Sequence, residues 1–350
     1  MKSVMISELI PGMVLGEDIL YNEEILYPKN TVLNEVVIKG LNRYSIEKAV
    51  IKEDIDLAAT HYERVRFNDD FKLFAEKHKK NLFVYKRLML NFIETKQLIP
   101  DSALLAIYND MASTYSYGSE LLDFLYNLIP NEDELTFNHC LNSALLSGTF
   151  ADWNNMPRQD ADQLILACFY YDIGKLKLPY EILWKAGKLT DEEFALVKKH
   201  PVIGYALLNQ TNIDQRIKNA VIMHHERMNG SGYPYHMKGN GIDLYARYIA
   251  IIDTYIAMAS PRSYRDALTP LQILGYFELN MQEYDTEILL PLMKRIGDAQ
   301  IGSTVQLNDG SVWEVVIIHP AAKSRPILKN DNAQVLDLLE HPELQIVKSL

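Results

Sequence analysis

The part of the chain richest in chemically informative residues reads His224-His225-Glu226-Arg227-Met228-Asn229-Gly230-Ser231-Gly232-Tyr233-Pro234. Its first residues stand at the predicted end of a helix that begins near Ile213, and its glycines predict a loop before the next helix. Successive residues of a helix diverge by about 100°, so two adjacent imidazoles suit a helix end beside a pair of metal ions better than one shared ion. The structural alternative is that they bind the last carbonyls of the helix.

Helical patterns extend in both directions from this stretch. Between residues 136 and 280, apolar residues recur at helical spacing, and loops that contain Gly or Pro interrupt them. Thr190 and Glu193 match a capping box, which predicts the start of a helix. That helix is expected to end at His200-Pro201, because proline interrupts a helix. This region is therefore predicted to be an all-helical bundle.

Smaller modules flank the bundle. Before it, the sequence favours one long helix over about His61–Gln97, or two that break near Asn68–Asp70, and then a second helical stretch over Ala103–Leu128. Residues 129–133 resemble a linker. After it, Asn308-Asp309-Gly310 between two apolar runs is a strong hairpin signal. The predicted organisation is a small β-containing N-terminal module at 1–60, a helical region at 61–133, the helical domain at 134–300 and a C-terminal β-hairpin segment at 301–350. The expected fold class is mainly α.

The composition is that of a globular protein. The 350 residues are 48% hydrophobic and 23% charged. No apolar run approaches the roughly 18 residues of a membrane span and no signal-peptide pattern is found, so we expect a cytoplasmic protein without a membrane partner. The net charge of −11, without a dense Lys/Arg block, argues against a nucleic-acid polymer as partner. Cys140 and Cys168 lie in apolar sequence and are predicted to be buried thiols.

Two acidic residues lie in strongly apolar helical sequence. An ionised Asp253 in such a helix needs a partner or a metal, because desolvation is costly. Asp172 is followed three residues later by Lys175 on the same predicted helix face, so a structural salt bridge is the alternative to a functional acid. Together with His139 and His200 on other predicted helices, these acids form a candidate cluster for zinc, iron or manganese.

Three segments in the matching order resemble the HD-GYP family, a branch of the metal-dependent HD phosphohydrolases whose members typically hydrolyse cyclic di-GMP. They are Tyr171-Asp172-Ile173-Gly174-Lys175, then Lys199-His200-Pro201 with Gly204, and the stretch 224–234 quoted above. The family's later motifs fall at Arg247, Asp253, Arg262, Tyr264 and Arg265. The resemblance covers residues 136–280 and implies an HD-type helical bundle.

The resemblance also implies a set of metal ligands. Family members hold two divalent ions, which here would be Fe, Mn or Zn. Tyr171 stands where the family has its defining histidine, and a phenol is a poorer ligand than imidazole at neutral pH. The set of ligands to one of the two ions is thereby reduced, so that one ion is expected to be held better than the other. The ligands that carry over are His139, Asp172, His200, His224, His225 and Asp253.

A mechanism follows from the same resemblance. Asp172 would bridge the metal ions, a bridging hydroxide would attack phosphorus in line, and Lys175 would stabilise charge on the phosphoryl oxygens. The product would be the linear dinucleotide pGpG, GMP, or both. Substrate binding is assigned to Gly232, Tyr233, Pro234, Arg262 and Arg265. For the two arginines, an ordinary surface ion pair is the alternative.

Other functions stay open at this stage. The substitution at Tyr171 favours, as an alternative, a catalytically impaired protein that binds cyclic di-GMP as a receptor or acts as a signalling interaction module. A second alternative is an HD phosphohydrolase that acts on another nucleotide. Two kinds of protein partner also stay open, a second copy of the chain in a homodimer and other signalling proteins.

Overall fold

The computed structural model describes residues 1–350 except 10–12, 22, 23, 30, 32, 34, 45, 53–63, 129–133, 184, 186, 261–266 and 331. The predicted linker at 129–133 therefore lies outside the described residues. The chain divides into two compact units, Met1–Asn68 and Asp69–Leu350, and each is described by itself. None of the described helices is long and apolar enough to cross a membrane.

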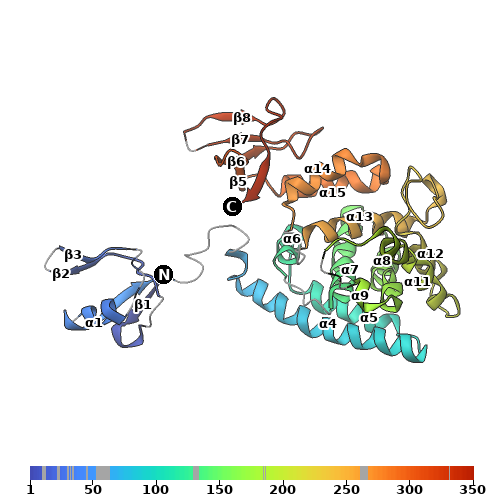
Figure 1. The fold of residues 1–350 in the computed structure, drawn as a ribbon, viewed down its shortest axis with the longest axis horizontal. Coiled ribbons are helices and arrows are strands. Elements are labelled where there is room, and N and C mark those ends of the chain that lie inside the picture. Colours follow the sequence, from blue (N-terminus) through green and yellow to red (C-terminus); the bar gives the residue numbers. More distant parts are fainter. Residues whose placement is uncertain are drawn as a thin grey trace. The chain divides into compact units, whose positions relative to one another are not determined.

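Among its described residues, the first unit combines short strands with the 3₁₀ turn η1 (Ile6–Glu8) and helix α1 (Glu35–Arg43) (Figure 1). Strand β1 (Lys2–Met5) pairs antiparallel with β4 (Lys48–Ile51), and β2 (Ile19–Tyr21) pairs antiparallel with β3 (Glu24–Tyr27). The sequence did not predict helix α1 (Glu35–Arg43), which lies between β3 and β4 in the chain. The buried core of the first unit comprises Val4, Ile6, Leu9, Leu15, Ile19, Leu33, Leu41, Ala49 and Ile51.

The second unit is mainly helical, as predicted. Its helices are α4 (Asp69–Thr95), α5 (Asp101–Ala112), α6 (Gly118–Asn127), α7 (Leu135–Trp153), α8 (Arg158–Tyr170), α9 (Tyr180–Leu183), α10 (Asp191–Val197), α11 (His200–Asn209), α12 (Gln215–Met223), α13 (Leu244–Ala259), α14 (Pro270–Leu279) and α15 (Thr286–Asp298), with short 3₁₀ segments η3 (Ile173–Lys177), η4 (Gly239–Gly241) and η5 (Met281–Glu283). Helix α7 is buried from Phe137 to Ala151, and α4, α5, α6, α8, α13 and α15 all contact it. It is the central element of the bundle.

Local sequence signals place several of these helix ends. The predicted capping box is present, because the Thr190 hydroxyl accepts from the Glu193 amide and the Glu193 carboxylate accepts from the Thr190 amide. Helix α10 ends at Val197, and α11 begins at His200 with Pro201 in its first turn. Proline thus marks the start of a new helix here, and this start fixes where His200 points.

The helical stretch predicted over Ala103–Leu128 contains two helices, α5 and α6, and the break between them was not predicted. The chain leaves the helix after Ala112. The Ser113 hydroxyl donates to the Asp110 carbonyl and the Thr114 hydroxyl donates to the Met111 carbonyl. These side chains compete with the backbone amides for the last carbonyls of α5, which ends the helix.

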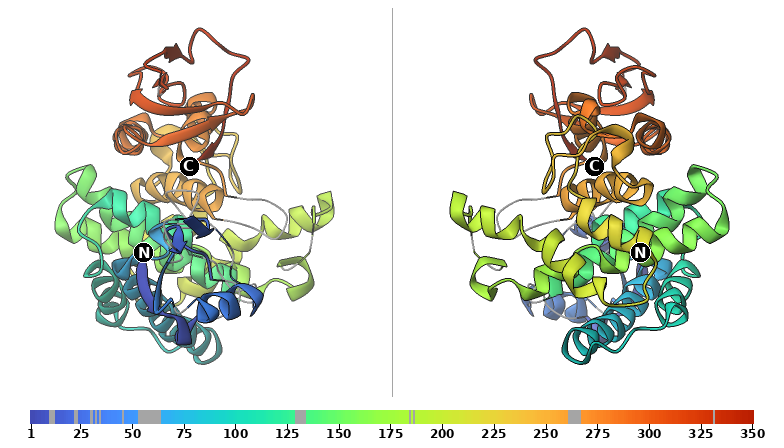
Figure 2. Two further views of the ribbon diagram at one scale, coloured as in Figure 1. Left: turned by 90° about the vertical axis from the view of Figure 1, so that its left-hand side faces the viewer. Right: turned by 90° about the vertical axis from the view of Figure 1, so that its right-hand side faces the viewer.

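The C-terminal residues form a five-stranded antiparallel sheet. Its strands are β5 (Thr304–Leu307), β6 (Val312–Ile317), β7 (Ile327–Lys329), β8 (Val335–Asp337) and β9 (Ile346–Ser349), in the order β8-β7-β6-β5-β9. The predicted hairpin joins β5 to β6, and Gly310 in its turn has a φ of 86°, which glycine adopts without strain. Helices α14 and α15 lie between this sheet and the rest of the bundle (Figures 1 and 2).

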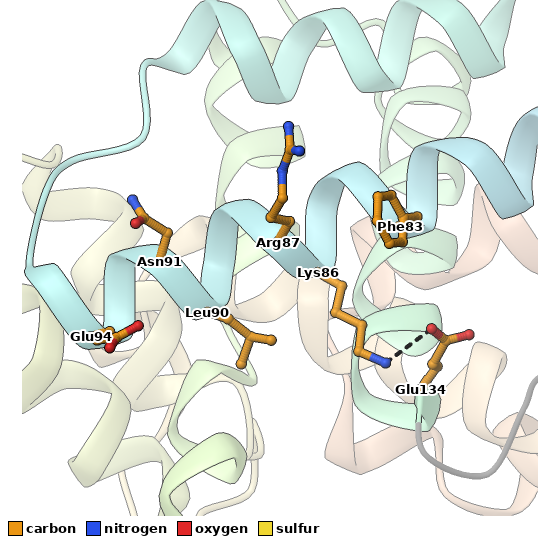
Figure 3. A pocket seen from close by; sticks show the side chains of 7 residues that line it. All are labelled: Phe83, Lys86, Arg87, Leu90, Asn91, Glu94 and Glu134. Carbon is orange, nitrogen blue, oxygen red and sulfur yellow. Dashed lines mark hydrogen bonds and ion pairs between the residues drawn. The ribbon is translucent and has the colours of Figure 1, made fainter.

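A hollow of about 540 Å³ lies along α4 (Figure 3). It is lined by Phe83, Lys86, Arg87, Leu90, Asn91, Glu94 and Glu134. The Lys86 Nζ donates to Glu134 Oε1 at 3.0 Å and so ties α4 to the residue before α7. None of the lining residues is among the metal ligands or substrate contacts implied by the sequence.

Candidate metal centre

Five separate elements bring the six implied metal ligands together. His139 lies in the second turn of α7, Asp172 follows α8, His200 opens α11, His224 and His225 follow α12, and Asp253 lies in α13. All are buried except His225, which is half-buried. Donor atoms within 4.8 Å of one another form two groups that share Asp172. The first is Asp172, His200, His224 and His225, called the histidine-rich half below, and the second is His139, Asp172 and Asp253, called the α7–α13 half.

In the histidine-rich half, two imidazoles are oriented by backbone carbonyls. The Nδ1 of His200 lies 2.7 Å from the Val197 carbonyl oxygen, and the Nδ1 of His224 lies 2.8 Å from that of Val221. A neutral imidazole that donates from Nδ1 carries its lone pair on Nε2. The two Nε2 atoms are 3.1 Å apart, so their lone pairs repel unless a proton or a cation lies between them.

A carboxylate oxygen lies beside these two nitrogens. Asp172 Oδ1 is 3.2 Å from His200 Nε2 and 3.6 Å from His224 Nε2. It is fully buried and has no hydrogen-bond partner among the described residues. An unpartnered buried carboxylate oxygen is costly. These N and O donors fit a divalent cation such as zinc, iron or manganese.

The α7–α13 half is connected by hydrogen bonds. His139 Nε2 lies 2.7 Å from Asp253 Oδ1. The Tyr171 hydroxyl donates to the same oxygen at 3.3 Å and lies 3.0 Å from the Ser143 hydroxyl. Tyr171, which the sequence resemblance aligned with the family's histidine, therefore lies among the implied ligands. Ser143, one turn beyond His139 on α7, had not been singled out from the sequence.

Lys175 is paired with Asp172 as the sequence suggested, although the local structure differs from the prediction. Helix α8 ends at Tyr170, and both residues belong to the 3₁₀ turn η3 and its N-cap. Residues three apart eclipse each other in a 3₁₀ helix. The Lys175 Nζ accordingly donates to Asp172 Oδ2 at 2.6 Å, with the Asp172 side chain fully buried.

The pKa shifts match the protonation states that metal ligands need. Burial disfavours the charge on Asp172 and Asp253, but the charge of Lys175 lowers the pKa of Asp172 and the hydrogen bond with His139 lowers the pKa of Asp253. Burial lowers the pKa of His200 and of His225, which keeps both imidazoles neutral near pH 7. Metal ligation requires ionised carboxylates and neutral imidazoles. Burial and the two carboxylates raise the pKa of Tyr171 well above its usual value, so it stays a phenol.

The glycine-rich loop at residues 229–234 folds back on His225. The Tyr233 ring stacks on the His225 ring with centroids 4.6 Å apart and an interplanar angle of 22°. The Tyr233 amide donates to the His225 carbonyl at 3.1 Å. A Cβ on Gly232 would lie 2.3 Å from that same carbonyl oxygen, so only glycine permits this approach. Pro234 follows Tyr233 through a cis peptide bond.

Two polar residues hold this loop. The Glu226 carboxylate is buried and accepts from the amides of Tyr235 and Met237 at 2.7 and 3.0 Å. The Asn229 side chain accepts from the amide and hydroxyl of Ser231. The sequence motif gave no role to Glu226. This residue follows His224 and His225 directly, but the amides that it binds lie nine and eleven residues further along the chain, which no local pattern reveals.

The structure does not describe every implied substrate contact. Arg262 and Arg265, together with Tyr264, fall within 261–266 and so lie outside the described residues. Arg247 is described, and its guanidinium donates to the Ile242 carbonyl and to Asp285. It thus supports the start of α13.

Comparison with known proteins finds an HD domain in this chain and relatives that are named cyclic di-GMP phosphodiesterases. A profile of the HD domain matches residues 123–288. Cyclic di-GMP phosphodiesterase PA4108 of Pseudomonas aeruginosa is 30% identical over 219 residues, which are 62% of this chain and 52% of that protein. A cyclic di-GMP phosphodiesterase of Thermotoga maritima is 30% identical over 243 residues, 69% of this chain and 61% of that protein. The chain thus spans between half and two thirds of the length of these relatives.

A solved structure has a similar fold. Bd1817, a HDG"Y"P protein from Bdellovibrio bacteriovorus, matches with a TM-score of 0.51 at 16% sequence identity, over 84% of this chain and 99% of that chain. At this identity the match concerns the fold alone. It agrees with the mainly α architecture described above.

Proposed function

We propose that this chain, which belongs to the HD-GYP branch of the HD-domain family, is a metal-dependent phosphodiesterase that hydrolyses cyclic di-GMP. One observation carries the proposal. Asp172 Oδ1 is buried without a hydrogen-bond partner among the described residues, beside the Nε2 atoms of His200 and His224. Two relatives that match 62% and 69% of the chain are named cyclic di-GMP phosphodiesterases.

The chemistry of the substrate explains why such a site is useful. A phosphodiester repels an anionic nucleophile, and a bound divalent cation would acidify a water molecule and polarise a phosphoryl oxygen. Asp172, His200, His224 and His225 would hold that cation, which we propose to be iron, manganese or zinc. His139 and Asp253 complete the polar wall of the same site.

Other residues of the chain would act on the substrate directly. Lys175 places an ammonium group beside Asp172, and its side chain is 22% exposed, so it can reach a phosphoryl oxygen at the site. The loop that carries Gly232, Tyr233 and Pro234 would line the substrate site. Arg262 and Arg265 would contact phosphate or guanine, since the guanidinium group pairs with phosphate in a bidentate manner.

The assay that tests this function follows cyclic di-GMP by chromatography with the full chain and added Fe²⁺, Mn²⁺ or Zn²⁺. We expect conversion to pGpG, GMP or both. Asp172→Ala and His224→Ala should each lower turnover by more than about 100-fold, because loss of a direct ligand costs more than loss of a supporting contact. His319→Ala is the matched control, since His319 pairs with Asp337 near the C-terminal sheet and should leave turnover unchanged.

The same assay separates the alternatives. Tight binding of cyclic di-GMP without turnover would support a receptor or signalling interaction module and contradict the enzyme. Turnover of another nucleotide in preference to cyclic di-GMP would support an HD phosphohydrolase of different specificity. A second copy of the chain and other signalling proteins remain proposed partners, which analytical ultracentrifugation and pull-down assays with cyclic di-GMP would test.

A further inference from the structure

The two halves of the candidate metal centre differ in how well their donor atoms are satisfied. In the histidine-rich half, Asp172 Oδ1 has no hydrogen-bond partner among the described residues. The Nε2 atoms of His200 and His224 face each other at 3.1 Å while their Nδ1 atoms are engaged by carbonyls. A divalent cation bound by these three atoms would satisfy all of them at once. The two ligands that belong to the α7–α13 half alone differ in this respect, because His139 Nε2 and Asp253 Oδ1 pair with each other and Asp253 Oδ1 also accepts from Tyr171.

The pairing in the α7–α13 half centres on one oxygen of Asp253. Asp253 Oδ1 lies 2.7 Å from His139 Nε2 and accepts from the Tyr171 hydroxyl at 3.3 Å. The Tyr171 hydroxyl also contacts the Ser143 hydroxyl at 3.0 Å. A second ion between His139 and Asp253 would have to replace the hydrogen bond between them.

The ring of Tyr171 is held in place, so this arrangement is not easily changed. Tyr171 is fully buried, and its ring packs edge-to-face on His224 with centroids 5.0 Å apart. It also lies 6.0 Å from the His139 ring. The phenol thus occupies the position from which an imidazole would offer a nitrogen lone pair, and it supplies a hydrogen-bond donor instead.

We propose that the chain holds one divalent metal ion, in the histidine-rich half, and that Tyr171 closes the α7–α13 half as a hydrogen-bonded network with Ser143, Asp253 and His139. The proposal rests on the proposed function only in taking the histidine-rich half to be a metal site. It differs from the resemblance, which implies two ions. A second ion should bind at least about 100-fold more weakly than the first, because a ligand is missing and the remaining ones are already paired.

The test is the metal content of the purified full chain. After loading with excess Mn²⁺ and gel filtration, elemental analysis should give one Mn per chain. The Tyr171→His variant restores an imidazole and should hold two. Tyr171→Phe is the matched control, because it removes the hydroxyl group without adding a donor, and it should hold one. Two ions per wild-type chain would overturn the proposal.

Electron paramagnetic resonance of the wild-type chain tests the number of bound ions even if Tyr171→His folds poorly. Two Mn²⁺ ions that share Asp172 would give an exchange-coupled electron paramagnetic resonance spectrum, whereas one ion gives an isolated Mn²⁺ spectrum. We expect the isolated spectrum from the wild-type chain at all loadings, and a coupled spectrum would contradict the inference.

The inference of one metal ion and the proposed enzyme activity can be contradicted separately. A chain with one ion and no hydrolysis of cyclic di-GMP would leave this inference standing and contradict the proposed enzyme. A chain with two ions and full turnover would do the reverse. A chain that binds no metal ion would overturn both.

Discussion

Gly174 controls the contact between the segment that carries Asp172 and the helix that begins with His200. A Cβ at this position would lie 1.9 Å from the His200 carbonyl oxygen and 2.7 Å from the Gly204 amide nitrogen. Both neighbours are backbone atoms, which cannot rotate away as a side chain does. The distance between Asp172 and His200 therefore depends on the absence of a side chain at Gly174.

We expect Gly174→Ala to separate η3 from α11. The variant should lose about 1–3 kcal/mol of unfolding free energy from overpacking, and should bind metal more weakly because His200 and Asp172 move apart. Urea unfolding and chelator competition measure the two effects. Gly275→Ala is the control. Gly275 lies inside helix α14, and its new Cβ would be in ordinary contact with Ser324 Cβ at 3.4 Å. Because alanine favours a helix more than glycine does, the free energy of unfolding should rise by about 0.5–1 kcal/mol. Unchanged metal affinity in Gly174→Ala would contradict this account.

The loop after His225 is an element that supports a proposed metal ligand. His200 and His224 are oriented by carbonyls, but no hydrogen bond reaches a ring nitrogen of His225 from the described residues. Its ring instead stacks on Tyr233, and the Glu226 carboxylate holds the following backbone in place. Because the loop fixes the ring of His225, the loop and the metal site should be coupled.

We predict that Tyr233 positions His225 through its ring. Tyr233→Phe keeps the stacked ring and should bind metal within a few-fold of the wild type, whereas Tyr233→Ala should weaken metal binding about 10- to 100-fold, as loss of a supporting contact does. Chelator competition with the full chain measures this affinity. Tyr235→Ala is the control, because Tyr235 is 58% exposed on the same loop. Equal metal affinity in the Phe and Ala variants would show that the ring does not position His225.

At the scale of the whole second unit, the helical bundle is stabilised partly by buried polar contacts between helices that are far apart in the sequence. His78 on α4 is buried, and its Nε2 lies 2.8 Å from Asn142 Oδ1 on α7. Burial lowers the pKa of His78 to about 4. At the opposite end, the Arg325 guanidinium donates to the carbonyls of Leu338, His341 and Leu344 and so anchors the C-terminal sheet.

His78 predicts a loss of stability on acidification. An unfolded chain protonates this histidine below about pH 6.5, whereas the folded protein does so only near pH 4. Between these values the unfolded state binds more protons, so the free energy of unfolding falls as pH falls, by up to about 3 kcal/mol in total. Urea unfolding at pH 7, 5.5 and 4.5 in the presence of a chelator measures this. His78→Gln keeps a donor for Asn142 and should show a weaker pH dependence. An identical dependence in both proteins would contradict the assignment.

Several elements could be predicted because their signals are local. The capping box at Thr190 and the Asn308-Asp309-Gly310 turn each depend on a few adjacent residues, and both are present in the structure. The break between α5 and α6 was not predicted. Its cause is the capture of carbonyls by Ser113 and Thr114, which outweighs a helical pattern that continues on both sides.

The residue types in the candidate site limit its chemistry before any folding, since imidazole and carboxylate groups in apolar helices suit few ions and few reactions. How those groups pair is a property of the folded chain. Ser143 and Tyr171 are 28 positions apart and Tyr171 and Asp253 are 82 apart, yet these three close one half of the site. Such contacts depend on how α7, α8 and α13 pack, and packing is set by the summed burial of many side chains and not by any short segment.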